Sequence, residues 1–196
     1  MSAHASKHVD SIHGGRSGIL RCCRLPAAGC RLLAPALVLS LGVCVESPAR
    51  SDKSAEHGDV ILIVKHERKL YLLRENYPLR TYRIALGLSP VGAKEHEWDF
   101  RTPEGRYVID FRREHSRYFK GLHISYPSPA DLKRSSALHR SAGGDIFIHG
   151  EPNRPTQPDS YYKTRDWTNG CIALSDEDLQ DLWDLTSGQT PVEIMP

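Results

Sequence analysis

Two residues in the C-terminal part of the chain have the types and the order expected of a thiol nucleophile and its base. Cys171 lies in the segment DWTNGCIAL, and His149 ends the apolar segment DIFIH before a glycine. A thiol attacks as its thiolate, so a catalytic cysteine needs a nearby base, and histidine titrates near neutral pH. Gly170 permits a tight turn whose backbone amides can stabilise an oxyanion. The pair predicts acyl transfer, whereas a buried small cysteine and a hydrogen-bonded histidine are the structural alternatives.

The first 49 residues have the features of an export leader. Four arginines precede an uncharged apolar run over residues 32–45, which matches a secretory signal and is short for a membrane span of about 20 residues. Small residues at 47 and 49 suit cleavage before Arg50. We expect a leader over 1–49, a catalytic domain over 50–196 and export to the periplasm or cell envelope. A lipoprotein and an uncleaved anchor, with membrane contact only through the leader, are alternatives.

Export would leave Cys171 as a lone thiol, because the other four cysteines all precede residue 45. An unpaired thiol in an oxidising compartment is exposed to stray coupling, so it calls for a chemical reason. The excess of basic over acidic residues also belongs to the leader, which has five Lys/Arg and two Asp/Glu. Residues 50–196 contain 21 Lys/Arg and 22 Asp/Glu, which gives no electrostatic basis for binding nucleic acid.

The segments around this pair are mostly short strands. Period-two patterns predict three strands within 60–87, and further strands over 106–113, 121–127, 144–150 and 191–195. Helices are predicted from Pro129 with Ser128 as N-cap, and after Ser175, which forms a capping box with Asp178. Residues 87–107 and 151–167 are predicted to be irregular loops. The sequence therefore predicts a mainly β single domain, a sandwich or partly closed barrel, with two helices.

The order of several motifs resembles the L,D-transpeptidase catalytic domain, the YkuD family. IHG is followed by TNGCIAL. Before them come YRIALG and RTPEG, and after them come a final helix and TPVEI, which is the order found in the family. The resemblance covers residues 58–196, and TNGC in place of the usual SHGC is similar to a divergent branch. It implies that Cys171 is the nucleophile, that His149 is its base and that the Gly150 carbonyl orients the imidazole. The residues expected to shape the site or its oxyanion hole are Gly150, Thr168, Asn169 and Gly170.

Two positions depart from the family's pattern, and three others are weaker candidates. Asn169 replaces a histidine, and Ala173 replaces an arginine that could anchor an anionic peptide. The candidates for substrate binding are His123, Arg165 and Trp167, which have ordinary structural explanations as well. A zinc site built from Cys171, His149 and His123 lacks the spacing and the fourth ligand that zinc requires.

By this resemblance the protein is expected to modify peptidoglycan. It would attack meso-diaminopimelate in a tetrapeptide stem, release D-Ala and pass the acyl group to an amine of a second stem or of an outer-membrane lipoprotein. No metal or organic cofactor is implied. A hydrolase of the same fold, which separates lipoprotein or peptide from peptidoglycan, is one alternative. A catalytically silent peptidoglycan-binding module is another.

Overall fold

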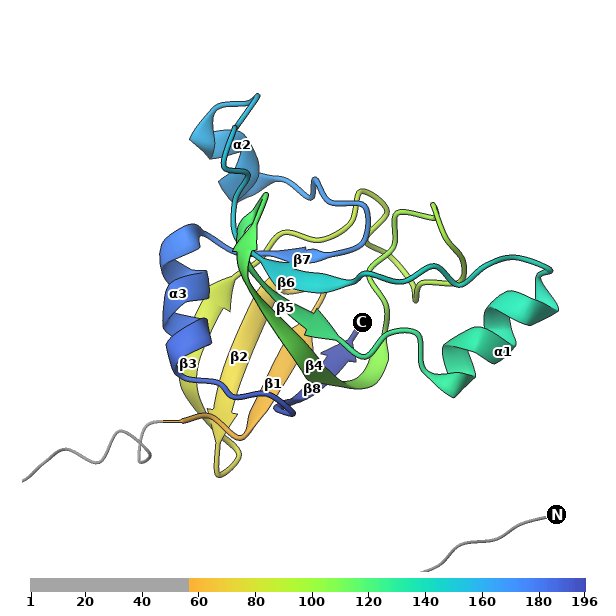
Figure 1. Ribbon diagram of the computed structural model, residues 1–196, viewed down its shortest axis with the longest axis horizontal. Coiled ribbons are helices and arrows are strands. Elements are labelled where there is room, and N and C mark those ends of the chain that lie inside the picture. Colours follow the sequence, from red (N-terminus) through yellow and green to blue (C-terminus); the bar gives the residue numbers. More distant parts are fainter. Residues whose placement is uncertain (1–56) are drawn as a thin grey trace, which may run out of the picture. The chain divides into compact units, whose positions relative to one another are not determined.

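A computed structural model describes residues 57–196, which form eight strands and three helices (Figure 1). The predicted leader lies outside the described residues. The strands are β1 (Val60–Val64), β2 (Lys69–Arg74), β3 (Tyr77–Arg83), β4 (Gly105–Ser116), β5 (Phe119–Ile124), β6 (Phe147–His149), β7 (Ile172–Ala173) and β8 (Pro191–Met195). The helices are α1 (Pro129–Ala137), α2 (Asp159–Thr164) and α3 (Asp176–Asp184). Among these residues no helix has the length and hydropathy needed to cross a bilayer.

The strands form a single sheet in the order β3-β2-β1-β8-β4-β5-β6-β7. The long strand β4 joins its two halves, because residues 105–108 pair with β8 whereas residues from Ile109 onward pair with β5. Register shifts in β4 follow Ile109 and Arg113, and such bulges bend a strand. Both predicted catalytic residues belong to the half formed by β4, β5, β6 and β7. His149 ends β6, and Cys171 directly precedes β7.

The hydrophobic core lies between side chains contributed by both halves of the sheet and by α3. Ile61 and Ile63 of β1 belong to the same buried cluster as Leu122 of β5, Ile148 of β6 and Ile172. Helix α3 packs against β5 and β6 through its apolar face (Figure 1). One face of β5 and β6 thus packs into the core, and the side chains that alternate with it point to the opposite face, where polar residues can lie.

Two of the helices begin where the sequence predicts. The Ser128 side chain accepts a hydrogen bond from the amide of Asp131, and the Asp131 carboxylate accepts one from the Ser128 amide, so α1 has a capping box. The Ser175 side chain accepts from the amide of Asp178 at the start of α3. This helix ends at Asp184.

The prediction of a mainly β domain is confirmed, with corrections in detail. The sheet is not a closed barrel, although Ala85 and Ala173 form an isolated antiparallel bridge between the chain after β3 and the edge strand β7. The expectation of two helices was wrong, because α2 lies inside the segment predicted to be an irregular loop. Its N-cap is Pro158, which has no capping side chain, so the usual signal for a helix start is missing. Strand β6 is also shorter than predicted.

Candidate active site

The two predicted catalytic side chains lie on one face of the sheet half formed by β4 to β7. Directly paired residues of neighbouring strands point to the same face. One such row contains Phe111, His123 and Phe147, and the β6–β7 register continues it to Cys171. The next row contains Arg113, Gly121, His149 and Ala173. Cys171 and His149 are therefore diagonal neighbours on adjacent parallel strands.

Cys171 is a partly exposed free thiol immediately before β7. Its Sγ accepts a hydrogen bond from the amide of Phe147 at 3.5 Å and lies 3.6 Å from the carbonyl oxygen of Asp145. Phe147 is the first residue of β6, the strand that carries His149, and Asp145 lies two residues before it. The thiol is thus held against the strand of its expected base.

His149 is buried at the end of β6, and its Nδ1 lies 2.7 Å from the carbonyl oxygen of Gly150. Because a carbonyl only accepts hydrogen bonds, Nδ1 carries the proton and Nε2 keeps a free lone pair. The ring is enclosed by Tyr118, with ring centroids 4.6 Å apart, and by Trp167 at 5.6 Å. The imidazole is therefore held in the tautomer that can accept a proton at Nε2.

Two residues fix the conformation of the TNGC turn: Thr168, whose hydroxyl forms hydrogen bonds within it, and Gly170, where a side chain would not fit. Thr168 is buried, its Oγ1 donates to the carbonyl of Cys171 at 2.7 Å, and it accepts from the amide of Gly170 at 3.1 Å. Gly170 has a φ of +132°, and a Cβ there would lie 2.7 Å from the carbonyl oxygen of Arg101. Asn169 is exposed. Since the Gly170 amide is engaged by Thr168, this glycine shapes the turn.

A salt bridge anchors the residues that precede the turn. The guanidinium of Arg68 donates to both carboxylate oxygens of Asp166, with its shortest contact at 2.7 Å. The same carboxylate accepts from the amide of Leu86 at 2.9 Å. Pairing with two donors of one planar guanidinium adds geometric definition to the contact. The loop after α2 is thus tied to the first hairpin of the sheet before it reaches Cys171.

Burial sets the protonation states of the pair. Desolvation lowers the pKa of His149 to about 4, and the hydrogen bond to Gly150 opposes only part of this shift. Burial also raises the pKa of the Cys171 thiol. The Phe147 amide and the charge of Lys94 oppose that rise, whereas the charge of Asp145 adds to it. At neutral pH the resting site therefore contains a neutral imidazole and a neutral thiol.

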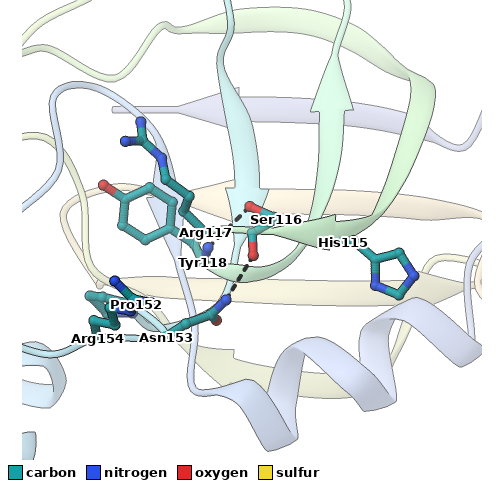
Figure 2. A pocket seen from close by; sticks show the side chains of 7 residues that line it. All are labelled: His115, Ser116, Arg117, Tyr118, Pro152, Asn153 and Arg154. Carbon is teal, nitrogen blue, oxygen red and sulfur yellow. Dashed lines mark hydrogen bonds between the residues drawn. The ribbon is translucent and has the colours of Figure 1, made fainter.

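Cys171 and His149 open into the same cavity, which has a volume of about 430 Å³. Its other lining residues are Arg113, His115, Ser116, Arg117, Tyr118, Asp145 and Phe147. A second cavity of about 610 Å³ shares residues 115–118 with the first and adds Pro152, Asn153 and Arg154 (Figure 2). The side chain of Asn153 donates a hydrogen bond to the carbonyl of Ser116 at 2.9 Å, which joins the loop after β6 to the end of β4. This bond is drawn as a dashed line in Figure 2.

The structure brings some of the weaker candidates near the pair and separates others from it. Trp167 contacts the His149 ring and lines a neighbouring cavity together with Tyr118. His123 is buried, and its Nδ1 lies 2.5 Å from Asp110, with Phe147 between it and Cys171 in the row. Arg165 is an exposed residue at the end of α2 and does not line the cavity of Cys171. Their roles in substrate binding stay predictions.

Of the residues that line the cavity, the sequence analysis named only Cys171 and His149, and it missed the others, among them Arg113, Tyr118 and Asp145. Tyr118 is in the β4–β5 turn and Asp145 precedes β6, and no sequence motif marks either position. Arg113 had a usable signal, because strand alternation places it on the face of Phe111, but the register that brings it toward His149 was not known. Within residues 57–196, no group of three or more His, Cys, Asp and Glu side chains is suited to hold a metal ion.

Comparison with known proteins identifies the family of the chain. The model of the L,D-transpeptidase catalytic domain, YkuD, matches residues 58–194, which is most of the chain. The chain belongs to this family. The predicted resemblance is thereby confirmed, whereas its assignment to a divergent branch with TNGC stays a prediction.

The relatives of this L,D-transpeptidase domain are distant. The chain is 27% identical over 134 residues to a protein of Escherichia coli (strain K12) named "Putative L,D-transpeptidase YafK", covering 65% of this chain and 47% of that protein. The chain thus spans about half the length of this curated relative. It also resembles the crystal structure of the helical cell shape determining protein Pgp2 from Campylobacter jejuni, with a TM-score of 0.51 and 24% identity. That match covers 69% of this chain and 46% of Pgp2, and it shows the fold alone.

Proposed function

We propose that the protein is an exported L,D-transpeptidase that modifies peptidoglycan through an acyl-enzyme on Cys171. The observation that carries the proposal is the shared cavity of Cys171 and His149, in which the Gly150 carbonyl fixes the proton on Nδ1 of the imidazole. The family match and the cell-shape role named for Pgp2 are consistent with a cell-wall substrate. The proposed acyl donor is a tetrapeptide stem that contains meso-diaminopimelate.

The first half-reaction forms a thioester. Sγ of Cys171 attacks the carbonyl carbon of the bond after the L-centre of diaminopimelate, while Nε2 of His149 takes the thiol proton. The tetrahedral intermediate then collapses, the carbon–nitrogen bond breaks, and His149 returns the proton to the departing amine of D-Ala. A neutral imidazole at the start is what this step requires, because an imidazolium has no lone pair to accept the proton.

The second half-reaction transfers the acyl group. An amine of another stem, or a lysine of an outer-membrane lipoprotein, attacks the thioester and loses its proton to His149. The carbon–sulfur bond breaks, and the thiol recovers its proton from the imidazole. The TNGC turn, held by Thr168 and Gly170, is proposed to place amides near the developing oxyanion.

The second candidate is a hydrolase of the same fold, in which water replaces the amine and releases a tripeptide stem or a lipoprotein. Two features favour keeping it. Asn169 cannot hold a proton as the family's histidine can, and Ala173 is buried and uncharged at the position next to His149 in the sheet. Neither residue supplies a charged contact for the peptide of an amine acceptor.

Product analysis separates the two candidates. The full chain is incubated with disaccharide-tetrapeptide, with and without a lysine-terminated lipoprotein peptide, and products are identified by mass spectrometry. A 3–3 crosslinked dimer or a lipoprotein adduct supports the transferase. Tripeptide with no crosslink would assign the hydrolase. If D-Ala is not released and a carbapenem adds no mass to Cys171, the chain is a binding module, and the enzymatic proposal is wrong.

A further inference from the structure

The loop between β3 and β4 contains an ion pair that is almost fully buried. Nζ of Lys94 donates to Oδ1 of Asp99 at 2.7 Å, and the two side chains are 4% and 6% exposed. The Asp99 carboxylate also accepts hydrogen bonds from the backbone amides of Glu95, His96 and Arg101. Removing two charges from water costs about as much as their attraction returns, so stability alone does not explain this pair.

The loop that holds this pair packs against the TNGC turn. The Leu88 amide donates to the carbonyl of Thr168 at 3.0 Å, which ties one end of the loop to the turn. At the other end, the carbonyl oxygen of Arg101 lies so close to Gly170 that a Cβ there would be 2.7 Å from it. The Asp99 carboxylate holds the Arg101 amide at 3.0 Å. The ion pair is therefore joined to the turn of the nucleophile through the backbone of one residue.

The positive end of the pair acts on the thiol. Burial raises the pKa of Cys171, whereas the Phe147 amide and the charge of Lys94 lower it. The charge of Asp145 raises the same pKa, but this side chain is exposed, so water and salt screen its field. Lys94 is buried, and its field is screened much less.

Other titratable groups face Cys171 from the strands around it. His149 comes from β6 and is neutral at neutral pH, because burial lowers its pKa to about 4. Solvent in the cavity screens the charges that line it, which leaves the buried ammonium of Lys94 as the cation with the least screened effect on sulfur. The other titratable residues of the cavity, all exposed except the tyrosine, are Arg113, His115, Arg117, Tyr118 and Asp145.

We propose that Lys94 is a further functional residue of this site, whose ammonium, held in place by Asp99, stabilises the negative charge that forms on Sγ of Cys171. This rests on the proposed function, in which the thiol is the nucleophile. During attack the thiol proton passes to Nε2 of His149, and the new charge on sulfur lies in the field of the ammonium. Lys94 keeps its own proton and forms no bond to the substrate. Asp99 is a positioning residue, because it acts through Lys94.

The test measures alkylation of Cys171 by iodoacetamide from pH 6 to pH 10 on the full chain, by mass spectrometry of the proteolytic peptide that contains this residue. Lys94→Met removes the cation, so the midpoint of the pH profile should move upward. The thiolate population at pH 7 should fall about tenfold, since a buried charge is weakly screened. The rate at pH 7 should fall only about threefold, because a thiolate of higher pKa is more nucleophilic.

Asp99→Asn distinguishes an electrostatic role from a structural one. It removes the anion that offsets Lys94 and keeps an oxygen that can accept from the loop amides, so the rate at pH 7 should rise about threefold. A loop that was merely loosened would respond to both variants in the same direction. Lys94→Arg keeps the positive charge and should react faster than Lys94→Met. Lys133→Met, at an exposed lysine of α1, is the matched control and should behave as the wild type.

The proposal is overturned if Lys94→Met and Asp99→Asn change the rate in the same direction, or if neither changes it. Urea denaturation shows whether each variant folds, and if one does not, the direction of the other decides. The wild-type chain is assayed in parallel for release of D-Ala from disaccharide-tetrapeptide. Opposite changes without release would support the role of Lys94 and reject the proposed enzymatic function. Release without these changes would reject the role of Lys94 alone.

Discussion

Iodoacetamide should alkylate Cys171 about tenfold faster for each pH unit between pH 6 and pH 8, because the resting thiol is neutral. Only the thiolate reacts, and below the thiol pKa its population grows tenfold per unit. The alternative is a preformed thiolate–imidazolium pair, which would react at a nearly constant rate over this range. The two resting states imply different roles for His149: a base during attack, or a cation already formed.

The burial of the site gives the size of the effect. The pKa of His149 is about 4, and that of Cys171 lies above its ordinary value of 9.0. Moving the proton from sulfur to nitrogen thus spans at least about 5 pH units, or about 7 kcal/mol. Attraction between the charges formed recovers about 4 kcal/mol at a separation of ~4 Å and an effective dielectric constant of about 20. The remainder, roughly 3 kcal/mol, limits the ion pair to on the order of 1% of molecules.

The assay follows one peptide. Because the chain has four further cysteines in its first 45 residues, the rate is read by mass spectrometry on the proteolytic peptide that contains Cys171. His149→Gln should leave the slope over pH 6–8 unchanged, since the imidazole is neutral throughout. His66→Gln, at an exposed histidine, is the matched control. A plateau in wild-type reactivity between pH 5 and pH 8 that disappears in His149→Gln would refute the neutral resting pair.

Three further predictions concern stability and the turn. Gly170→Ala should lower the free energy of unfolding by about 3 kcal/mol, from its φ of +132° and the clash with the Arg101 carbonyl, as measured by urea denaturation. Thr168→Val removes a hydroxyl that bonds Cys171 and Gly170, so it should cost about 2 kcal/mol by the same method and slow carbapenem acylation as well. The contribution of His149 to the free energy of unfolding should be complete above pH 6.5 and should fall by up to about 3 kcal/mol as pH decreases toward 4. The reason is that the imidazole binds a proton in the unfolded chain at a pH where buried His149 stays neutral. His149→Gln should remove that part of the pH dependence, and an unchanged acid profile would contradict it.

The strands could be predicted, and Cys171 and His149 could be proposed as a catalytic pair, because their sequence signals are local. Period-two alternation identifies which residues of β1, β2 and β5 face the core, and Ser128 and Ser175 mark two helix starts. The His-Gly and Gly-Cys dipeptides indicate a strand end and a tight turn. The contact of His149 with the Gly150 carbonyl follows from the resemblance to the family and is present in the structure.

The residues that complete the cavity could not be predicted because their positions depend on pairing between distant segments. Arg113 reaches the site through the register of β4, β5 and β6, which a bulge at residue 110 alters. Asp145 approaches the thiol by a left-handed backbone that no flanking pattern signals. Helix α2 lacks a capping side chain, so composition alone indicated a loop.

Trapping the acyl-enzyme tests the central claim most directly. The full chain is mixed with disaccharide-tetrapeptide, quenched in acid, and the mass of the peptide containing Cys171 is determined. We predict an increase equal to the stem without its D-Ala, which is absent from Cys171→Ala and strongly reduced in His149→Gln. Release of D-Ala by Cys171→Ala at the wild-type rate would contradict the assignment of Cys171 as the nucleophile.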